Sequence, residues 1–218
     1  MSAVKLFQHD GVFKMRRGAI VSPTFAYETW GELDPSGRNV VLIFTGLSPS
    51  AHVASSIEDP SSGWWEDMVG PDKPVDTNRY FVVCINSLGS CFGSTGPASI
   101  NPATGRHYRL DFPVLSLEDV AAGGALLLDH LGIERLHTVM GASMGGMTAL
   151  AFTLLFPERS NGLIAISSAT RSLPFSIAVR SLQREIIRTD PDWQNGQYPF
   201  DAGPTNGMRL ARKLGMIS

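Results

Sequence analysis

The sequence predicts an α/β fold built on a mostly parallel sheet flanked by helices. Short, continuous apolar runs such as VVLIF at 40–44 are typical of strands buried on both faces. These runs alternate with longer segments in which apolar residues recur at helical spacing. Alternating strands and helices with buried strands indicate a parallel sheet with helices packed on it.

Five segments have the composition of strands, and turn-forming residues separate them. Asp34-Pro-Ser-Gly lies between the first two, and a loop rich in Gly, Ser and Pro runs from Asn86 to Pro113. The predicted strands are Ile20–Glu28, Val40–Phe44, Tyr80–Ile85, Leu136–Met140 and Gly162–Ile166.

Helices are predicted between and after these strands. Ser116 precedes an acidic residue at capping-box spacing, and the apolar periodicity that follows ends at Gly132. A second helix, 146–156, is stopped by Pro157. After Ala169 the sequence changes to an amphipathic, Arg-containing segment at 174–188 and a further helical stretch from Gly207. We therefore expect 1–170 to form part of a core and 171–218 to begin an excursion from the sheet.

Composition excludes several classes of protein. The 218 residues are 43% hydrophobic and 17% charged, which describes a globular chain that can bury a core. A net charge of −2 with scattered Lys and Arg predicts no nucleic-acid partner. Two cysteines are too few for a disulfide framework or a four-cysteine metal site, and no metal is expected. We see no signal peptide or membrane span, so a cytoplasmic location is expected.

Gly141-Ala-Ser143-Met-Gly145 matches the G-x-S-x-G pattern of a nucleophile elbow. The pattern needs a strand before the serine and a helix after it, and both are predicted here. Ser143 is therefore our candidate nucleophile. The alternative is a glycine-rich connection with a solvated serine.

A nucleophilic serine also needs an oxyanion hole and a base. The N–H of Met144 and an N–H from the loop after 40–44, for which we take Leu47, are the expected oxyanion donors. In this arrangement the triad Asp and His follow the serine, but all five histidines precede it. Either the triad is unorthodox or the later part is missing. Because 207–218 breaks off within a helical pattern, we expect the second. The histidines are His9, His52, His107, His130 and His137.

Many strings, in one order, resemble the acyl-CoA-dependent homoserine and serine O-acyltransferases of the α/β-hydrolase superfamily. The similarity is closest to the serine O-succinyltransferases of that family. The strings are Tyr27-Glu-Thr-Trp-Gly, Gly46-Leu-Ser-Pro-Ser-Ala-His, Gly63-Trp-Trp-Glu, Asn86-Ser-Leu-Gly-Ser-Cys, Gly93-Ser-Thr-Gly-Pro-Ala-Ser-Ile-Asn-Pro, Leu110-Asp-Phe-Pro, the elbow, Gln183-Arg, Asp190-Pro-Asp-Trp and Leu210-Ala-Arg-Lys-Leu-Gly.

The resemblance implies an α/β-hydrolase fold with an inserted helical lid. It makes 1–170 the N-terminal part of the core and 171–218 the beginning of the lid, with the triad Asp and His in a C-terminal remainder absent from this chain. It implies an enzyme of cysteine and methionine biosynthesis that is a homodimer at full length. No cofactor is bound, and succinyl-CoA or acetyl-CoA is the cosubstrate. The 218-residue chain alone is expected to be inactive.

The resemblance also assigns roles to residues. Ser143 takes the acyl group and passes it to an amino-acid hydroxyl, and Arg212 holds the substrate carboxylate. The loop of Gly46, Leu47, Ser48 and Pro49 is similar to the serine-using branch. Arg180 stands where acetyl-using relatives carry a neutral residue, and a cation there suits the free carboxylate of succinyl-CoA. Phe92 departs from the basic residue common in relatives.

Other interpretations stay open. The activity is expected to be L-serine O-succinyltransferase, with homoserine O-acetyltransferase, a serine esterase, or an inactive fragment as alternatives. Arg180, Arg184 and Arg188 could form only a solvated helix face. For His52 we expect a packing or hydrogen-bonding role rather than that of a base. For Cys91 we expect a buried thiol.

Overall fold

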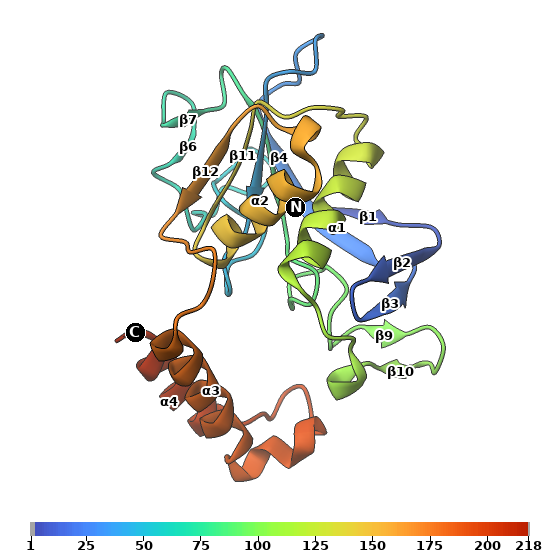
Figure 1. Cartoon of the computed structure of the whole chain (residues 1–218), viewed down its shortest axis with the longest axis vertical. Helices are drawn as coiled ribbons and strands as arrows, with labels where there is room; N and C mark the ends of the chain where they lie inside the picture. Colours follow the sequence, from blue (N-terminus) through green and yellow to red (C-terminus); the bar gives the residue numbers. More distant parts are fainter. Residues whose placement is uncertain (1–2, 218) are drawn as a thin grey trace. The chain divides into compact units, whose positions relative to one another are not determined.

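The computed structural model describes residues 3–217. The chain divides into two compact units, one ending at Ala169 and the other beginning at Thr170. The first unit contains a six-stranded sheet, and Figure 1 shows two helices, α1 (Leu117–His130) and α2 (Met144–Leu155), on one of its faces. In spatial order the strands are β1 (Lys5–Gln8), β4 (Thr24–Trp30), β8 (Phe81–Ile85), β5 (Val40–Phe44), β11 (Thr138–Ala142) and β12 (Leu163–Ile166).

The sheet is mixed but mostly parallel. β8, β5, β11 and β12 run parallel to one another, whereas β4 pairs antiparallel with both β8 and β1. The predicted α/β class is confirmed. Because the parallel strands point the same way, the loops after β5, β8 and β11 leave the sheet at the same edge.

Both faces of the central strand β5 are buried, as its apolar sequence predicts. Leu42 and Phe44 belong to the core cluster that also contains the inner faces of α1 and α2. Val41 and Ile43 belong to a second cluster on the other face, which includes Val53 and Val69 from the connection between β5 and β8. The second face is therefore covered in this unit by a connecting segment and not by a helix.

The predicted start of α1 is confirmed in detail. The Ser116 hydroxyl accepts a hydrogen bond from the backbone N–H of Asp119, and the Asp119 carboxylate accepts one from the backbone N–H of Ser116. Asp therefore replaces Glu in a complete capping box.

One predicted strand is wrong. Ile20–Glu28 is interrupted at Ser22, whose φ of 47° turns the chain, and at Pro23, which has no N–H for a ladder. The segment before the break is β3 (Gly18–Val21), which pairs with β2 (Val12–Met15) in a separate hairpin, whereas the segment after it is β4. Alternation of side chains continues across the break, so it did not reveal the turn.

Other boundaries differ by small amounts. β11 begins at Thr138 and not Leu136, and α2 begins at Met144 because the helix follows Ser143 directly. The loop predicted at 86–113 contains a small hairpin of β9 (Ile100–Asn101) and β10 (Arg106–His107) and a 3-10 helix at Arg109–Asp111. The remaining short strands are β6 (Val69–Gly70) and β7 (Val75–Asp76).

β12 is less buried than its apolar sequence predicts. It pairs with β11 on one side, and no strand of residues 3–217 pairs with it on the other. Leu163 and Ile164 are 38% and 45% exposed. An apolar strand with an open edge is a surface that folded proteins usually cover.

The second unit is a helical pair. α3 (Pro174–Arg188) and α4 (Thr205–Gly215) are joined through a kinked 3-10 segment, Pro191–Gly196. Gln183 donates from its amide to the carbonyl of Ala211, 2.8 Å away, which ties α3 to α4. Across the whole described range, no helix has the length and apolar character needed to cross a membrane.

Glu66 organises the connection that covers the second face of the sheet. Its carboxylate accepts hydrogen bonds from the backbone N–H groups of Ser55 and Gly63, at 2.8 and 2.9 Å, and from the Ser55 hydroxyl. Lys73 lies 3.1 Å away. These donors, the backbone groups first, lower the pKa of Glu66 from 4.5 to about 2.

We expect Glu66→Gln to destabilise the protein at pH 7 by about 1–2 kcal/mol, because neutral glutamine cannot accept the same charge-assisted bonds. Because the pKa of Glu66 is lowered in the folded state, its carboxylate stabilises the folded protein fully above the unfolded-state pKa of 4.5. This stabilisation is lost as pH falls toward about 2. Denaturant unfolding at pH 7, 4 and 2.5 should show the difference shrinking with acidity. Glu58→Gln, in the same connection, is the control, and an equal loss in both variants would contradict the assignment.

Candidate active site

Ser143 forms the whole connection between β11 and α2. Its backbone has φ 56° and ψ −121°, a conformation that non-glycine residues rarely adopt. Strain of this kind costs about 1–3 kcal/mol and persists only where the surroundings enforce it. The side chain is exposed. The turn therefore presents a serine hydroxyl at the edge where the parallel strands end.

Two glycines make this turn possible. A Cβ added to Gly141 would lie 2.4 Å from the carbonyl carbon of Gly145, and a Cβ on Gly145 would lie 2.2 Å from the carbonyl oxygen of Phe44. Real Cβ atoms do not approach backbone this closely. The small residues of the motif are thus required by the contact between the elbow, α2 and the end of β5.

Hydrogen bonds hold the elbow from the other side as well. The N–H of Ser143 donates to the carbonyl of Ile166 in β12, 2.9 Å away. The Ser143 carbonyl accepts from the Ser168 hydroxyl at 2.8 Å and from the N–H of Met147. The backbone of Ser143 is fixed, and its hydroxyl is left for other partners.

A cavity of about 400 Å³ lies beside the elbow, and Leu47 and Met144 both line it. The sequence predicted these two residues to act together, and the fold brings them to one cavity. The Thr45 and Ser87 hydroxyls, 3.0 Å apart and buried, join the loops after β5 and β8, and both residues line the cavity. The lining residues are Thr45, Gly46, Leu47, Pro49, Ser87, Leu88, Gly89, Ser90, Leu115, Ser116, Leu117, Val120 and Met144.

None of the five histidines is hydrogen-bonded to Ser143 within residues 3–217. His52 instead bonds to Glu28 and to the carbonyl of Ser61. His137 bonds to Thr138, and His130 stacks on Phe7. Over the same residues, no group of His, Cys, Asp and Glu has an arrangement that could hold a metal ion.

Arg180 and Arg212 lie in the second unit, on α3 and α4, and both are exposed. The Arg180 guanidinium donates to the side-chain oxygen of Gln183, 2.8 Å away. Gln183 in turn contacts the carbonyl that precedes Arg212 in the chain. The structure thus joins the two arginine-bearing helices, while the elbow belongs to the first unit.

The two cysteines differ in burial, and one of them differs from the prediction. Cys91 is exposed, so the prediction of a buried thiol there is wrong; it lies in a loop whose neighbour Phe92 is also 46% exposed. Cys84 is fully buried in β8, and burial raises the pKa of its thiol well above the ordinary value. Apolar flanks at Cys84 signal burial, whereas the Gly/Ser-rich context of Cys91 signals a surface loop.

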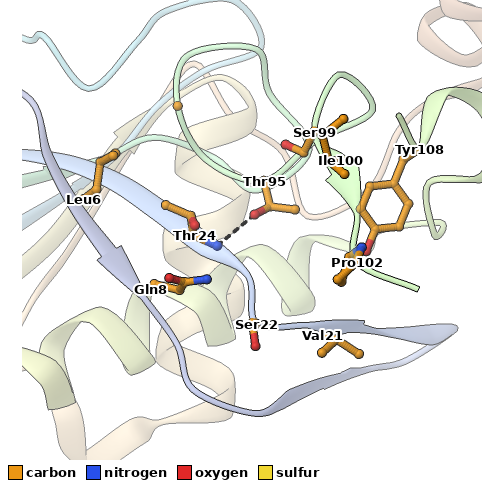
Figure 2. Close-up of a pocket in the computed structure, with 11 residues that line it drawn as sticks. Leu6, Gln8, Val21, Ser22, Thr24, Thr95, Ser99, Ile100, Pro102 and Tyr108 are labelled. Carbon is orange, nitrogen blue, oxygen red and sulfur yellow. Dashed lines mark hydrogen bonds between the residues drawn. The ribbon is translucent and has the colours of Figure 1, made fainter. Parts of the chain in front are cut away.

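A second cavity, of about 380 Å³, lies between the N-terminal strands and the 93–108 loop (Figure 2). Figure 2 shows the backbone N–H of Thr24 bonded to the Thr95 hydroxyl at its wall. All its side chains are uncharged, so it offers no general base. They are Leu6, Gln8, Val21, Ser22, Thr24, Gly93, Thr95, Ser99, Ile100, Pro102 and Tyr108.

The mostly parallel sheet and the strand-turn-helix elbow are typical of the α/β-hydrolase fold. The family model for the alpha/beta hydrolase fold matches residues 39–218, and the chain belongs to this family.

Curated relatives with high identity to this chain have transferase names. The chain is 57% identical over 217 residues to a serine O-succinyltransferase from Litchfieldella anticariensis, covering 99% of this chain and 59% of that protein. It is 56% identical to an L-serine/homoserine O-acetyltransferase from Streptomyces lavendulae, covering 96% of this chain and 56% of the relative. The chain therefore spans less than two thirds of the length of either relative.

Comparison with a solved structure agrees with the sequence comparisons. The homoserine O-acetyltransferase from Bacillus anthracis superposes with a TM-score of 0.91 at 35% identity, covering all of this chain and 61% of that one. The identity is high enough for the similarity to concern the family as well as the fold.

Proposed function

We propose that this chain is part of an acyl-CoA-dependent acyltransferase that makes O-succinyl-L-serine from succinyl-CoA and L-serine. The observation that carries the proposal is Ser143, held exposed in a strained backbone turn next to Met144, which lines a cavity. A serine in that conformation suits covalent catalysis. The 57% identity to a serine O-succinyltransferase supports the choice of substrates.

The first half of the reaction forms an acyl-enzyme. The Ser143 Oγ attacks the thioester carbonyl, and its proton passes to a general base. The carbonyl oxygen becomes an oxyanion, for which the N–H groups of Leu47 and Met144 are the proposed donors. The carbon–sulfur bond then breaks, and CoA leaves as a thiol with the proton that the base returns. Met144 begins α2, so the positive end of the helix dipole also favours the oxyanion.

The second half transfers the acyl group to the acceptor. The L-serine hydroxyl loses its proton to the base and attacks the ester carbonyl; the bond to Ser143 Oγ then breaks, and the base returns the proton to Ser143, which is again a free hydroxyl. Arg212 is proposed to hold the acceptor carboxylate, because a guanidinium can bind both oxygens at once. The loop of Gly46, Leu47, Ser48 and Pro49 is proposed to select serine, supported by the fact that three of these residues, Gly46, Leu47 and Pro49, line the cavity.

The base is proposed to come from the portion that the longer relatives contain beyond the matched region. Two observations support this. None of the imidazoles described in residues 3–217 bonds to Ser143, and the apolar edge of β12 is open to a further strand. We propose that the 218-residue chain by itself has no transferase activity and regains it when mixed with a fragment that completes the fold.

Arg180 is proposed to bind the free carboxylate of the succinyl group. We expect Arg180→Asn in the full-length enzyme to lower kcat/KM for succinyl-CoA about tenfold relative to acetyl-CoA, which corresponds to about 1.4 kcal/mol of lost ion pairing. The measurement is steady-state kinetics with both donors. Arg188→Asn, two turns further along α3, should leave the donor preference unchanged. An unaltered preference in the Arg180 variant would refute its role.

The decisive assay crosses two donors with two acceptors. Succinyl-CoA and acetyl-CoA are each offered with L-serine and L-homoserine, and products are identified by mass spectrometry. O-Succinylserine as the preferred product supports the proposal. Preference for O-acetylhomoserine would indicate the acetyltransferase alternative, and release of free acid without any acceptor would indicate an esterase.

The cellular context is also a proposal. A role in cysteine or methionine biosynthesis, a cytoplasmic location, and a homodimer at full length follow from the proposed activity and the resemblance. Small molecules are the expected partners, with no resident cofactor. Light scattering of the full-length protein tests the oligomeric state.

A further inference from the structure

A buried carboxyl–imidazole pair joins strand β4 to the loop region that follows β5. Glu28 of β4 is 1% exposed, and its Oε2 lies 3.0 Å from Nδ1 of His52. On the far side of the ring, Nε2 lies 2.9 Å from the carbonyl oxygen of Ser61. Within the described chain, Glu28 Oε1 has no hydrogen-bond partner. His52 is thus the donor on which this buried carboxyl depends.

The contacts fix where the protons are. A carbonyl oxygen only accepts, and the Ser61 hydroxyl, 3.2 Å from Nε2, donates its own proton to Asp59 at 2.6 Å, so Nε2 carries a proton. The contact at Nδ1 needs one more proton, which either the imidazolium or the carboxyl holds. Without that proton, the Glu28 carboxylate would face the lone pair on Nδ1 of a neutral ring, and the hydrogen bond would be lost. The pair therefore holds together only while this shared proton is present.

Other groups around the pair act on the same proton. Burial lowers the pKa of His52, but the hydrogen bonds to Glu28 and Ser61 and the charges of Glu28 and Asp59 outweigh it, so the pKa lies above the ordinary 6.5. Cys84, the register partner of Glu28 on β8, has its thiol pKa raised by burial and by Glu28, so it stays neutral. The surroundings of the pair therefore favour retention of the shared proton.

The pair sits at the anchored end of the Leu47 loop. The loop leaves β5 after Phe44, is joined to Ser87 through the Thr45 hydroxyl, and is held again at Ser50 and His52. The indole N–H of Trp64 donates to the Ser50 carbonyl at 2.9 Å, and the backbone N–H of Trp64 donates to the His52 carbonyl. Residues 46–49, which include Leu47, lie between Thr45 and these contacts, so His52 helps to fix the C-terminal end of the loop.

We propose that Glu28 and His52 are positioning residues for acyl transfer, and that their shared proton holds the 46–49 loop in the geometry that acyl-enzyme formation needs. This inference rests on the proposed function. Neither residue touches the substrate. As pH rises and the shared proton is lost, the loop loses its anchor and acyl-enzyme formation slows.

Glu28→Gln in the full-length enzyme tests the proposal. The amide keeps the shape of the carboxyl and donates to Nδ1 of a neutral ring, while Nε2 still donates to Ser61. The loop should stay anchored, and the alkaline fall in kcat should disappear. His52→Ala should lower kcat about tenfold or more at every pH with a smaller change in KM. His107→Ala, an exposed histidine elsewhere, is the control and should match the wild type.

A second readout does not depend on activity. The His52 ring is titrated by nitrogen NMR in the wild type and in Glu28→Gln, and we expect a lower midpoint in the variant. Equal midpoints, or an unchanged alkaline inflection in kcat, would overturn the proposal even if His52→Ala fails to fold. An active Ser143→Ala variant would refute the proposed function. The His52 titration would still show independently whether Glu28 and His52 share a proton.

Discussion

Ser143→Ala in the full-length enzyme is expected to lower acyl transfer by at least about 10³–10⁴-fold, because no other hydroxyl occupies the elbow to form the covalent intermediate. With succinyl-CoA and no acceptor, the wild type should gain the mass of one succinyl group, and the variant should not. Intact-protein mass spectrometry and CoA release measure the two effects. Ser36→Ala, a hydroxyl in the Asp34 turn, is the matched control.

The same position gives a stability test of the strain. Ser143→Gly should lose the activity but raise the unfolding free energy by about 1 kcal/mol, because glycine adopts φ 56° without a Cβ penalty. Denaturant unfolding measures the difference. Full transfer activity in either Ser143 variant, or a Gly variant less stable than the Ala variant, would contradict the elbow assignment.

The second large effect is expected at Gly145. An added Cβ would lie 2.2 Å from the carbonyl oxygen of Phe44, and neither the strand end nor the first turn of α2 can move away without breaking the sheet. We expect Gly145→Ala to cost about 3 kcal/mol or more, a large part of the stability of a typical domain. Loss of the folded state or of the cooperative unfolding transition is the measurable result.

The control for this prediction is a glycine in open space. Gly105 has φ +67° with no atom within 4 Å of an added Cβ, so Gly105→Ala should cost only about 1 kcal/mol from backbone strain. Chemical unfolding of the two variants side by side measures the steric part. Similar losses at both positions would show that the contact between the elbow and β5 is not as tight as the structure indicates.

The sequence was informative wherever local chemistry decides the structure. The capping box at Ser116 and the buried strand 40–44 depend on neighbouring residues and on simple periodicity, and both are found as predicted. The break at Ser22 was missed because side-chain alternation continues through it. The exposure of β12 was missed because an apolar strand has the same sequence whether or not another strand covers its edge.

The Glu28–His52 pair shows the same limit for the site. Both residues lie in strings that carry the family resemblance, yet they are 24 positions apart, and nothing local indicates their contact. A lone acidic residue in an otherwise uncharged strand was the available signal. It indicates a buried charge that needs a partner, but it does not say which residue is the partner.

The sequence by itself determined the α/β class, the position of the elbow and the identity of Ser143 as the candidate nucleophile, because a tight strand-to-helix turn imposes its glycines locally. Only the tertiary structure decided that Leu47 and Met144 share one cavity, that Glu66 closes the connection over the second face, and that Glu28 and His52 meet in the interior. These contacts join segments far apart in the chain, and they depend on strand order and register.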